Sequence, residues 1–112
     1  MAYNEALADR VRKALAGRTE VTEKRMFGGL TFMLGSSMCC GVVKDDLMVR
    51  VGPEGYEAAL ADPGARPMDF TGRPMRGMVY VGSDGHRTDA DLGRWVGRGA
   101  DFAGSLPRGR RR

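Results

Sequence analysis

Hydrophobic residues recur at helical spacing near both ends of the chain. Leu7, Val11 and Leu15 lie four residues apart behind Asn4, which predicts an amphipathic helix over residues 4–15, capped by Asn4 and ended near Gly17. A last helix is predicted from residue 88 or 89 onward, because the same spacing returns at Leu92, Trp95, Val96 and Gly99. Gly93, Gly97 and Gly99 weaken this helix, so packing under Trp95 is expected to hold it.

Between these helices the apolar positions alternate as they do in strands. The pattern predicts extended segments at residues 24–34, 38–44, 47–51, 68–70 and 77–81. The first is interrupted at residues 28–29, where two glycines indicate a bulge or a close backbone approach. In the third, Leu47 and Val49 share one face, and Met48 and Arg50 share the other.

The order of these elements defines a fold class. A short helix opens at residues 52–54 and stops at residues 62–64, which gives the order α-βββ-α-ββ-α. We therefore predict a two-layer α+β domain over residues 1–106, with an antiparallel sheet of about five strands and helices on one face. Residues 107–112 are predicted to be a disordered basic tail.

Charge is distributed unevenly along the chain. The net charge is +4, but four arginines lie in the last five residues, and without them 14 basic residues balance 14 acidic ones. The domain itself is therefore close to neutral. No apolar run is long enough to cross a membrane, and the first residues have no apolar signal-peptide core, so we expect a cytoplasmic protein without a membrane partner.

No combination of residues predicts catalysis, a metal site or a cofactor. His86 is the only histidine and lies in a glycine-flanked turn, where we expect a solvated side chain. Cys39 and Cys40 are adjacent, so in a regular strand their side chains point to opposite faces, and we expect reduced thiols with at least one buried. The chain also lacks a phosphate-binding glycine motif. We therefore predict a protein that is not an enzyme; an unrecognised enzyme would need a pocket with convergent polar groups.

Two features are candidates for molecular contacts. Methionines are numerous and gather near the strands, where they fill a core or form an adaptable binding surface. Arginines near them could form a basic, methionine-edged patch or be solvated charges. The candidate interaction surface consists of Met48, Arg50, Arg73, Met75 and Arg76. The candidate nucleic-acid tail consists of Arg108, Arg110, Arg111 and Arg112.

Four segments in this order resemble a known family. They are KRMFGGL (24–30), MCCGVV (38–43), DLMVRVG (46–52) and PMDFTGRPM (67–75), and together they resemble the TfoX/Sxy N-terminal domain. The resemblance runs from the first helix to the last and implies a two-layer fold with an antiparallel sheet, similar to type III secretion chaperones. It offers no catalytic residues. The founding members carry a further C-terminal helical domain, and we expect this chain to be a stand-alone N-terminal domain.

The resemblance also implies a function. Founding members regulate natural competence and are thought to act with a cyclic-AMP receptor protein at promoters. We therefore expect a regulatory module that contacts a protein partner, such as a component of the transcription machinery. Weak, nonspecific nucleic-acid binding through the arginine tail is the alternative. A homodimer is a further expectation, because an open sheet leaves edges or a face to cover.

Overall fold

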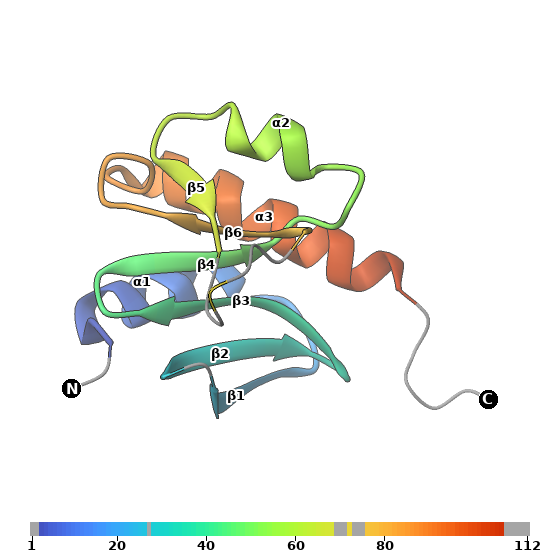
Figure 1. Ribbon diagram of the computed structural model, residues 1–112. Helices are drawn as coiled ribbons and strands as arrows, with labels where there is room; N and C mark the ends of the chain where they lie inside the picture. The colour runs from blue at the N-terminus through green and yellow to red at the C-terminus, as the bar shows by residue number, and fades with distance from the viewer. Residues whose placement is uncertain (1–2, 27, 69–71, 73–75, 107–112) are drawn as a thin grey trace.

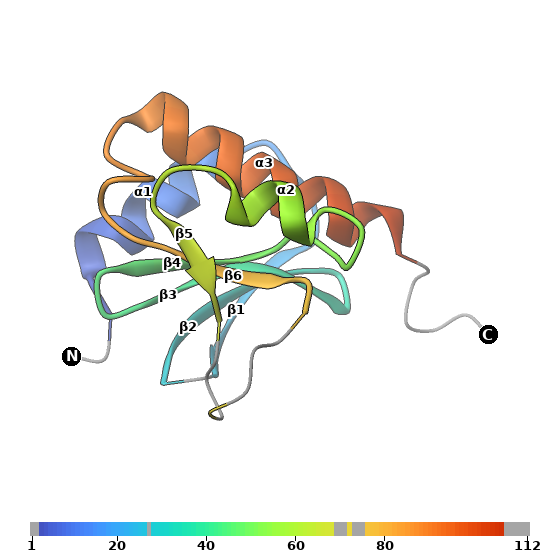
Figure 2. The same cartoon turned by 45° about the horizontal axis from the view of Figure 1, so that its top comes forward.

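The computed structural model describes residues 3–26, 28–68, 72 and 76–106. The elements follow in the order α1 (Glu5–Leu15), β1 (Val21–Met26), β2 (Gly29–Leu34), β3 (Ser37–Val43), β4 (Asp46–Arg50), α2 (Tyr56–Leu60), β5 (Ala65–Pro67), β6 (Met78–Val81) and α3 (Asp89–Ser105). One antiparallel sheet contains the strands in the order β1-β2-β3-β4-β6-β5, so β1 and β5 form its edges. The helices lie on one side of it, which confirms the predicted α+β architecture (Figures 1 and 2).

The sheet has six strands and not the predicted five. Residues 24–34 were expected to form one interrupted strand, but β1 and β2 are separate strands that pair as a hairpin, with Met26 opposite Gly29. Gly28 adopts a φ of +75° in the connection, a conformation that glycine accepts at little cost. A side chain at position 29 would lie 2.1 Å from the carbonyl oxygen of Val42, so the expected close backbone approach is confirmed there.

The fifth strand lies slightly earlier in the chain than predicted. β5 spans Ala65–Pro67, whereas the prediction placed a strand at residues 68–70, of which residues 69 and 70 lie outside the described part. Met68 still continues toward β6, since its N–H donates to the carbonyl oxygen of Met78 at 3.4 Å. β5 is the edge strand of the sheet on this side, and it lies in contact with α2.

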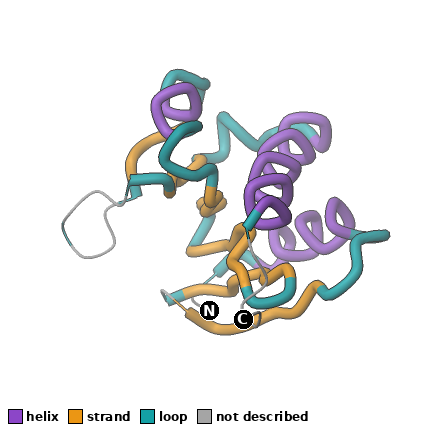
Figure 3. Tube along the Cα trace, turned by 90° about the vertical axis from the view of Figure 1, so that its right-hand side faces the viewer, coloured by secondary structure: helices purple, strands orange, loops and turns teal. Residues whose placement is uncertain are grey.

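The main core lies between the sheet and the helices. Its centre is a row of fully buried side chains that crosses four neighbouring strands: Phe32, Cys40, Val49 and Val79. From above, α1 contributes Leu7, Val11 and Leu15, and α3 contributes Leu92, Trp95 and Val96. The apolar stripes predicted for both helices are thus the buried faces, and α1 and α3 lie side by side over the sheet (Figure 3).

A second, smaller core occupies the opposite face of the sheet. It consists of Met38, Met48, Met68 and Met78, against which Met33, Val43 and Tyr80 pack. Gly41 leaves space for Met48, whose terminal methyl carbon would lie 2.5 Å from a side chain at that position. Flexible methionines can fill such irregular space, so these residues are core and not an exposed binding surface.

A β-bulge interrupts the pairing of β2 with β3. Phe32 lies opposite Cys40 and Met33 lies opposite Met38, which leaves Cys39 as an extra residue on β3. Both cysteines are consequently buried in the main core, and their sulfur atoms lie 3.8 Å apart. The expectation that the two side chains point to opposite faces is therefore wrong, because it assumed regular strand geometry.

The helix α3 approaches this bulge more closely than any side chain would permit. A Cβ atom at Gly99 would lie 2.4 Å from the carbonyl oxygen of Cys39 and 3.4 Å from its sulfur. By contrast, a Cβ atom at Gly93, Gly97 or Gly104 would meet nothing within 4 Å. Only one of these four glycines is required by packing, and the other three lower the intrinsic stability of the helix.

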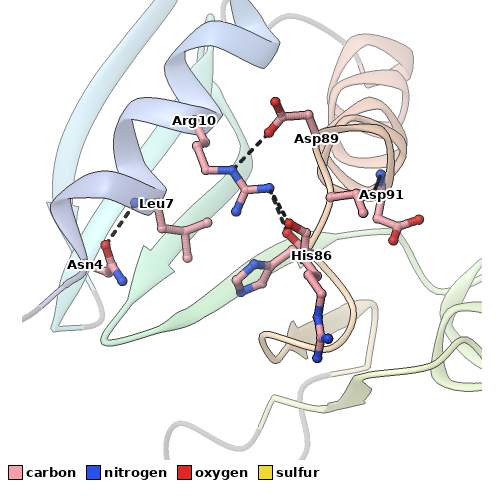
Figure 4. Close-up of polar contacts among 8 residues, drawn as sticks. Asn4, Leu7, Arg10, His86, Asp89 and Asp91 are labelled. Carbon is pink, nitrogen blue, oxygen red and sulfur yellow. Dashed lines mark hydrogen bonds and ion pairs between the residues drawn. The ribbon is translucent and has the colours of Figure 1, made fainter.

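His86 is buried, which corrects the expectation of a solvated loop residue. Its side chain is 6% exposed, and Nε2 lies 3.1 Å from the carbonyl oxygen of Asp45 in the β3–β4 connection. Arg10 of α1 fixes the same loop, since its guanidinium donates to the carbonyl oxygen of His86 at 2.8 Å and to Asp89 at 3.1 Å (Figure 4). The loop before α3 is thus held between α1 and the sheet.

α1 begins at the predicted cap Asn4, and α3 begins where a helix start was predicted, with Thr88 as its cap. The side chain of Asn4 accepts the N–H of Leu7 at 3.0 Å, and Thr88 accepts the N–H of Asp91 at 3.0 Å. In the part of the chain described, neither helix combines the length and the apolar character that a membrane span requires.

The contrast between Gly99 and Gly97 gives a stability prediction. We expect Gly99→Ala to lower the free energy of unfolding by about 1–3 kcal/mol, because the new methyl group would press against backbone that has little room to move. Gly97→Ala should instead raise it by up to roughly 1 kcal/mol, because alanine favours the helix and meets no neighbour there. Urea unfolding of both variants measures the difference; equal effects of the two would contradict the close approach.

The ion pair between Arg12 of α1 and Glu23 of β1 predicts a pH dependence. The bond from Arg12 Nε to Glu23 is 2.7 Å long and lowers the pKa of Glu23 below its ordinary value of 4.5. The pair therefore stabilises the fold above about pH 4.5, and this stability is lost as the pH falls through the lowered pKa. We expect Glu23→Gln to cost at most about 1 kcal/mol at neutral pH, because both side chains are partly exposed.

Urea unfolding of this variant and of the wild type across the pH range checks that prediction. The two stability curves should converge in acid, whereas the control Glu57→Gln, on the exposed face of α2 and outside the ion pairs of the described residues, should cost little at neutral pH. A gap between wild type and Glu23→Gln that persists in strong acid would show that the pair contributes by packing and not by charge.

Candidate functional site

A pocket lies between α3 and the segment that joins β4 to α2. It has a volume of about 690 Å³, and its apolar surface is contributed by Val51, Pro53, Ala58 and Phe102. Arg98, Asp101 and Ser105 of α3 and Glu54 of the connecting segment add polar groups. We call this pocket the α3 groove.

Gly52 sets the shape of the α3 groove. It has a φ of +83°, and a Cβ atom there would lie 2.4 Å from the ring of Phe102. Its N–H and that of Val51 both donate to the carbonyl oxygen of Gly77, at 3.1 and 2.8 Å, which holds the segment against the start of β6. The backbone and the Phe102 ring therefore pack directly on each other, and the ring forms a fixed wall.

Two arginines stack on aromatic rings, one on Phe102 of the groove wall and one on Tyr56 of α2, the helix that also contributes Ala58 to the groove. The Arg50 guanidinium lies 5.3 Å from the ring centroid of Phe102, and that of Arg76 lies 5.6 Å from that of Tyr56. Within the described residues, neither arginine forms an ion pair. Stacking orients a guanidinium plane while its N–H groups stay available for an acceptor, so both are positioned to bind a carboxylate.

A third arginine on the groove wall is already neutralised. Arg98 stacks at 4.5 Å on the ring of Trp95 and pairs with Asp62 at 2.7 Å. The exposed side chains of Asp101 on α3 and Glu54 on the connecting segment add negative charge to the groove. The free positive charge therefore lies at Arg50 and Arg76 and not across the whole groove.

The structure brings together only part of the predicted interaction surface. Arg50 stacks on Phe102, which lines the groove, and Arg76 stacks on Tyr56 at the start of α2, whereas Met48 is fully buried in the methionine core. Arg73 and Met75 lie outside the described residues, as do all four tail residues: Arg108, Arg110, Arg111 and Arg112. Whether the remaining pair of arginines binds a partner stays a prediction.

The sequence pattern did not predict the aromatic rings on which Arg50, Arg76 and Arg98 stack. Arg98 and Trp95 are three residues apart on one helix, so helical spacing alone could have indicated their contact. Arg50 and Phe102 are about half the chain apart, and the stack forms only because α3 crosses the end of β4. Such a contact leaves no local signal in the sequence.

The two buried thiols have unequal acidities. The hydrogen bond with Cys40 lowers the pKa of the Cys39 thiol, and the charge of Arg18 adds to this effect, although burial opposes it. The same bond and complete burial raise the pKa of Cys40 well above its ordinary value. Cys39 is therefore the sulfur that ionises first.

Among the described residues, no three histidine, cysteine, aspartate or glutamate side chains lie close enough together to hold a metal ion. The His86 ring contacts the carbonyl oxygen of Asp45 and is not paired with either thiol in that part of the chain. The α3 groove combines an apolar wall, the Phe102 ring that Gly52 packs against, and the Arg50 guanidinium over that ring.

Comparison with known protein families matches residues 13–103 to the TfoX N-terminal domain. This range begins within α1 and ends within α3, so it includes the whole sheet and every residue that lines the α3 groove except Ser105. No curated protein and no solved structure matches the chain.

Gly52 provides a test of the groove wall. We expect Gly52→Ala to destabilise the fold by roughly 2–4 kcal/mol, because alanine adds strain at positive φ and also displaces the Phe102 ring. Gly17→Ala is the matched control, since Gly17 has a φ of +93° but nothing within 4 Å. It should cost only the backbone strain, about 1 kcal/mol, in the same urea unfolding measurement. Equal losses in the two variants would mean that the ring yields freely.

Proposed function

Because the chain belongs to the TfoX N-terminal domain family, we propose that it is a protein-binding module that acts by protein–protein contact in transcription regulation. The observation that carries this proposal is the pair of unneutralised arginines, stacked on aromatic rings beside an apolar groove. Aromatic and arginine side chains dominate the binding energy of protein interfaces.

The groove favours a partner segment of particular chemistry. An apolar side chain of the partner fits against Val51, Ala58 and Phe102, and a neighbouring carboxylate accepts N–H groups from Arg50 or Arg76. Glu54 and Asp101 repel a long acidic run. We therefore infer a segment with an isolated acidic residue between apolar ones.

The fixed ring and the oriented guanidinium groups lower the free-energy cost of binding a partner. Association costs free energy for every flexible side chain that becomes ordered. Stacking has already restricted Arg50 and Arg76, and Gly52 has already fixed the ring of Phe102. These side chains are therefore already ordered in the unbound protein, so less free energy is lost when a partner binds.

Site-specific photo-crosslinking in cell lysate tests the proposal. A photoreactive residue at position 58 faces the groove, and one at position 94, on the exposed part of α3, provides the matched control. We expect a discrete protein adduct from position 58 alone. Its yield should fall about tenfold or more in the double variant Arg50→Gln, Arg76→Gln, because charge-assisted hydrogen bonds contribute roughly 1.5–3 kcal/mol each.

The control for charge is Arg94→Gln, which removes an arginine paired with Asp91. This variant should capture the partner as the wild type does. Equal adducts from positions 58 and 94, or a yield that ignores Arg50 and Arg76, would refute the groove as the contact surface. If random duplex DNA shifts the chain in a gel and deletion of residues 108–112 abolishes the shift, nucleic-acid binding through the tail replaces protein contact as the leading function.

A further inference from the structure

The β-bulge places two thiols together in the main core. Cys39 and Cys40 are both fully buried, and their sulfur atoms are 3.8 Å apart. Regular strand geometry would separate the side chains of adjacent residues across the sheet, so the bulge itself creates this pair. Both cysteines are free thiols in the structure.

The backbone of α3 lies directly against Cys39. The sulfur of Cys39 lies 4.0 Å from the carbonyl oxygen of Val96, and Gly99 contributes no side chain above it. Gly97 and Gly104 flank this stretch of α3 without any packing requirement for glycine. Because each glycine in a helix favours local opening, the C-terminal half of α3 is the element whose opening would expose Cys39.

The two thiols are suited to different steps of an oxidation reaction, because their pKa values differ. Cys39 ionises more readily than Cys40, because the hydrogen bond with Cys40 and the charge of Arg18 lower the pKa of its thiol against the opposing effects of burial and Asp101. Cys40 remains a protonated thiol at the same pH, since burial and the neighbouring sulfur raise its pKa. One sulfur is therefore suited to attack an oxidant, and the other lies within reach to resolve the product.

We propose that Cys39 and Cys40 are a modification site at which hydrogen peroxide, a small neutral oxidant, closes a reversible vicinal disulfide. The Cys39 thiolate attacks one peroxide oxygen and the O–O bond breaks; the sulfur becomes a sulfenic acid, and hydroxide leaves and takes up a proton as water. The Cys40 sulfur then attacks the sulfenic sulfur, loses its proton and displaces a second water. Overall, two thiols lose two electrons and two protons, and one peroxide becomes two waters.

The covalent geometry makes the closed form easy to reduce. Adjacent Cα atoms are about 3.8 Å apart across a trans peptide, which is shorter than the roughly 4.4–6.8 Å found across ordinary disulfides. The ring must therefore distort the peptide between Cys39 and Cys40, and strained disulfides have more oxidising potentials. A dithiol reductant should reopen it readily.

Closure of the ring affects α3 directly. The carbonyl group that must rotate is that of Cys39, against which Gly99 packs. Trp95 lies one turn before Gly99 and Phe102 nearly one turn after it. Trp95 is the only tryptophan, so its fluorescence reports on this helix, and Phe102 transmits any shift to the α3 groove. The chemistry of the pair does not depend on the proposed function of the groove.

Thiol counting on the intact folded chain tests the inference. The protein is treated with hydrogen peroxide, unfolded, alkylated and weighed by mass spectrometry, which distinguishes lost thiols from oxidised methionines. We expect both alkylation sites to disappear together, to return with dithiothreitol, and the Trp95 emission to change reversibly in parallel. Cys40→Ala should instead accumulate a sulfenic acid at Cys39 that dimedone traps.

Two helix variants test the route of access. Gly97→Ala stiffens α3 beside the thiols and should slow oxidation about fivefold, the factor that corresponds to the helix preference for alanine. Gly93→Ala, two turns from Gly99 toward the N-terminus, should leave the rate unchanged. Equal rates in both variants would overturn the proposed opening of α3.

The inference is overturned if both thiols stay alkylatable at a peroxide concentration that oxidises the same chain in denaturant. It is also overturned if the product is a disulfide-linked dimer on a non-reducing gel, or an oxidised cysteine that dithiothreitol does not restore. Each of these outcomes is independent of whether the groove binds a protein.

Discussion

The contact between the α3 backbone at Gly99 and the carbonyl group of Cys39 is the constraint on which the helix layer depends. A side chain at position 99 would push the helix away from the sheet, because the atom it meets belongs to the backbone. With glycine there, α3 lies low enough for Trp95 and Ala100 to join the core. The position of Phe102 over Gly52 follows from the same approach, and so does the existence of the α3 groove.

The sheet separates two kinds of packing. On the helix side, branched and aromatic side chains such as Phe32, Val49 and Val79 fill the core in a few defined conformations. On the other side, the four buried methionines adapt to irregular space around Gly41. The polar contacts of Arg10 and His86 hold the loop before α3 on the helix side of the sheet, at the edge of the main core.

The local rules predicted most of the fold from the sequence. The caps at Asn4 and Thr88 were predictable from chemistry within a few residues, as were the two faces of β4. The bulge at Cys39 could not be predicted from the sequence. It arises from the register in which β2 and β3 pair, and no characteristic local residue pattern marks it. His86 was misjudged for the same reason: its burial depends on Asp45, about forty residues away. Of the candidate surface, the sequence supplied Arg50 and Arg76 but not the rings that orient them.

The two edge strands of the sheet affect whether copies of the chain can pair edge to edge. At one edge, β1 carries the charged residues Glu23, Lys24 and Arg25 in succession, and at the other, β5 is only three residues long and includes Pro67, which has no N–H to donate. Neither edge offers a second copy a long row of neutral hydrogen-bonding groups. Edge-to-edge pairing of two copies through the described strands is therefore disfavoured.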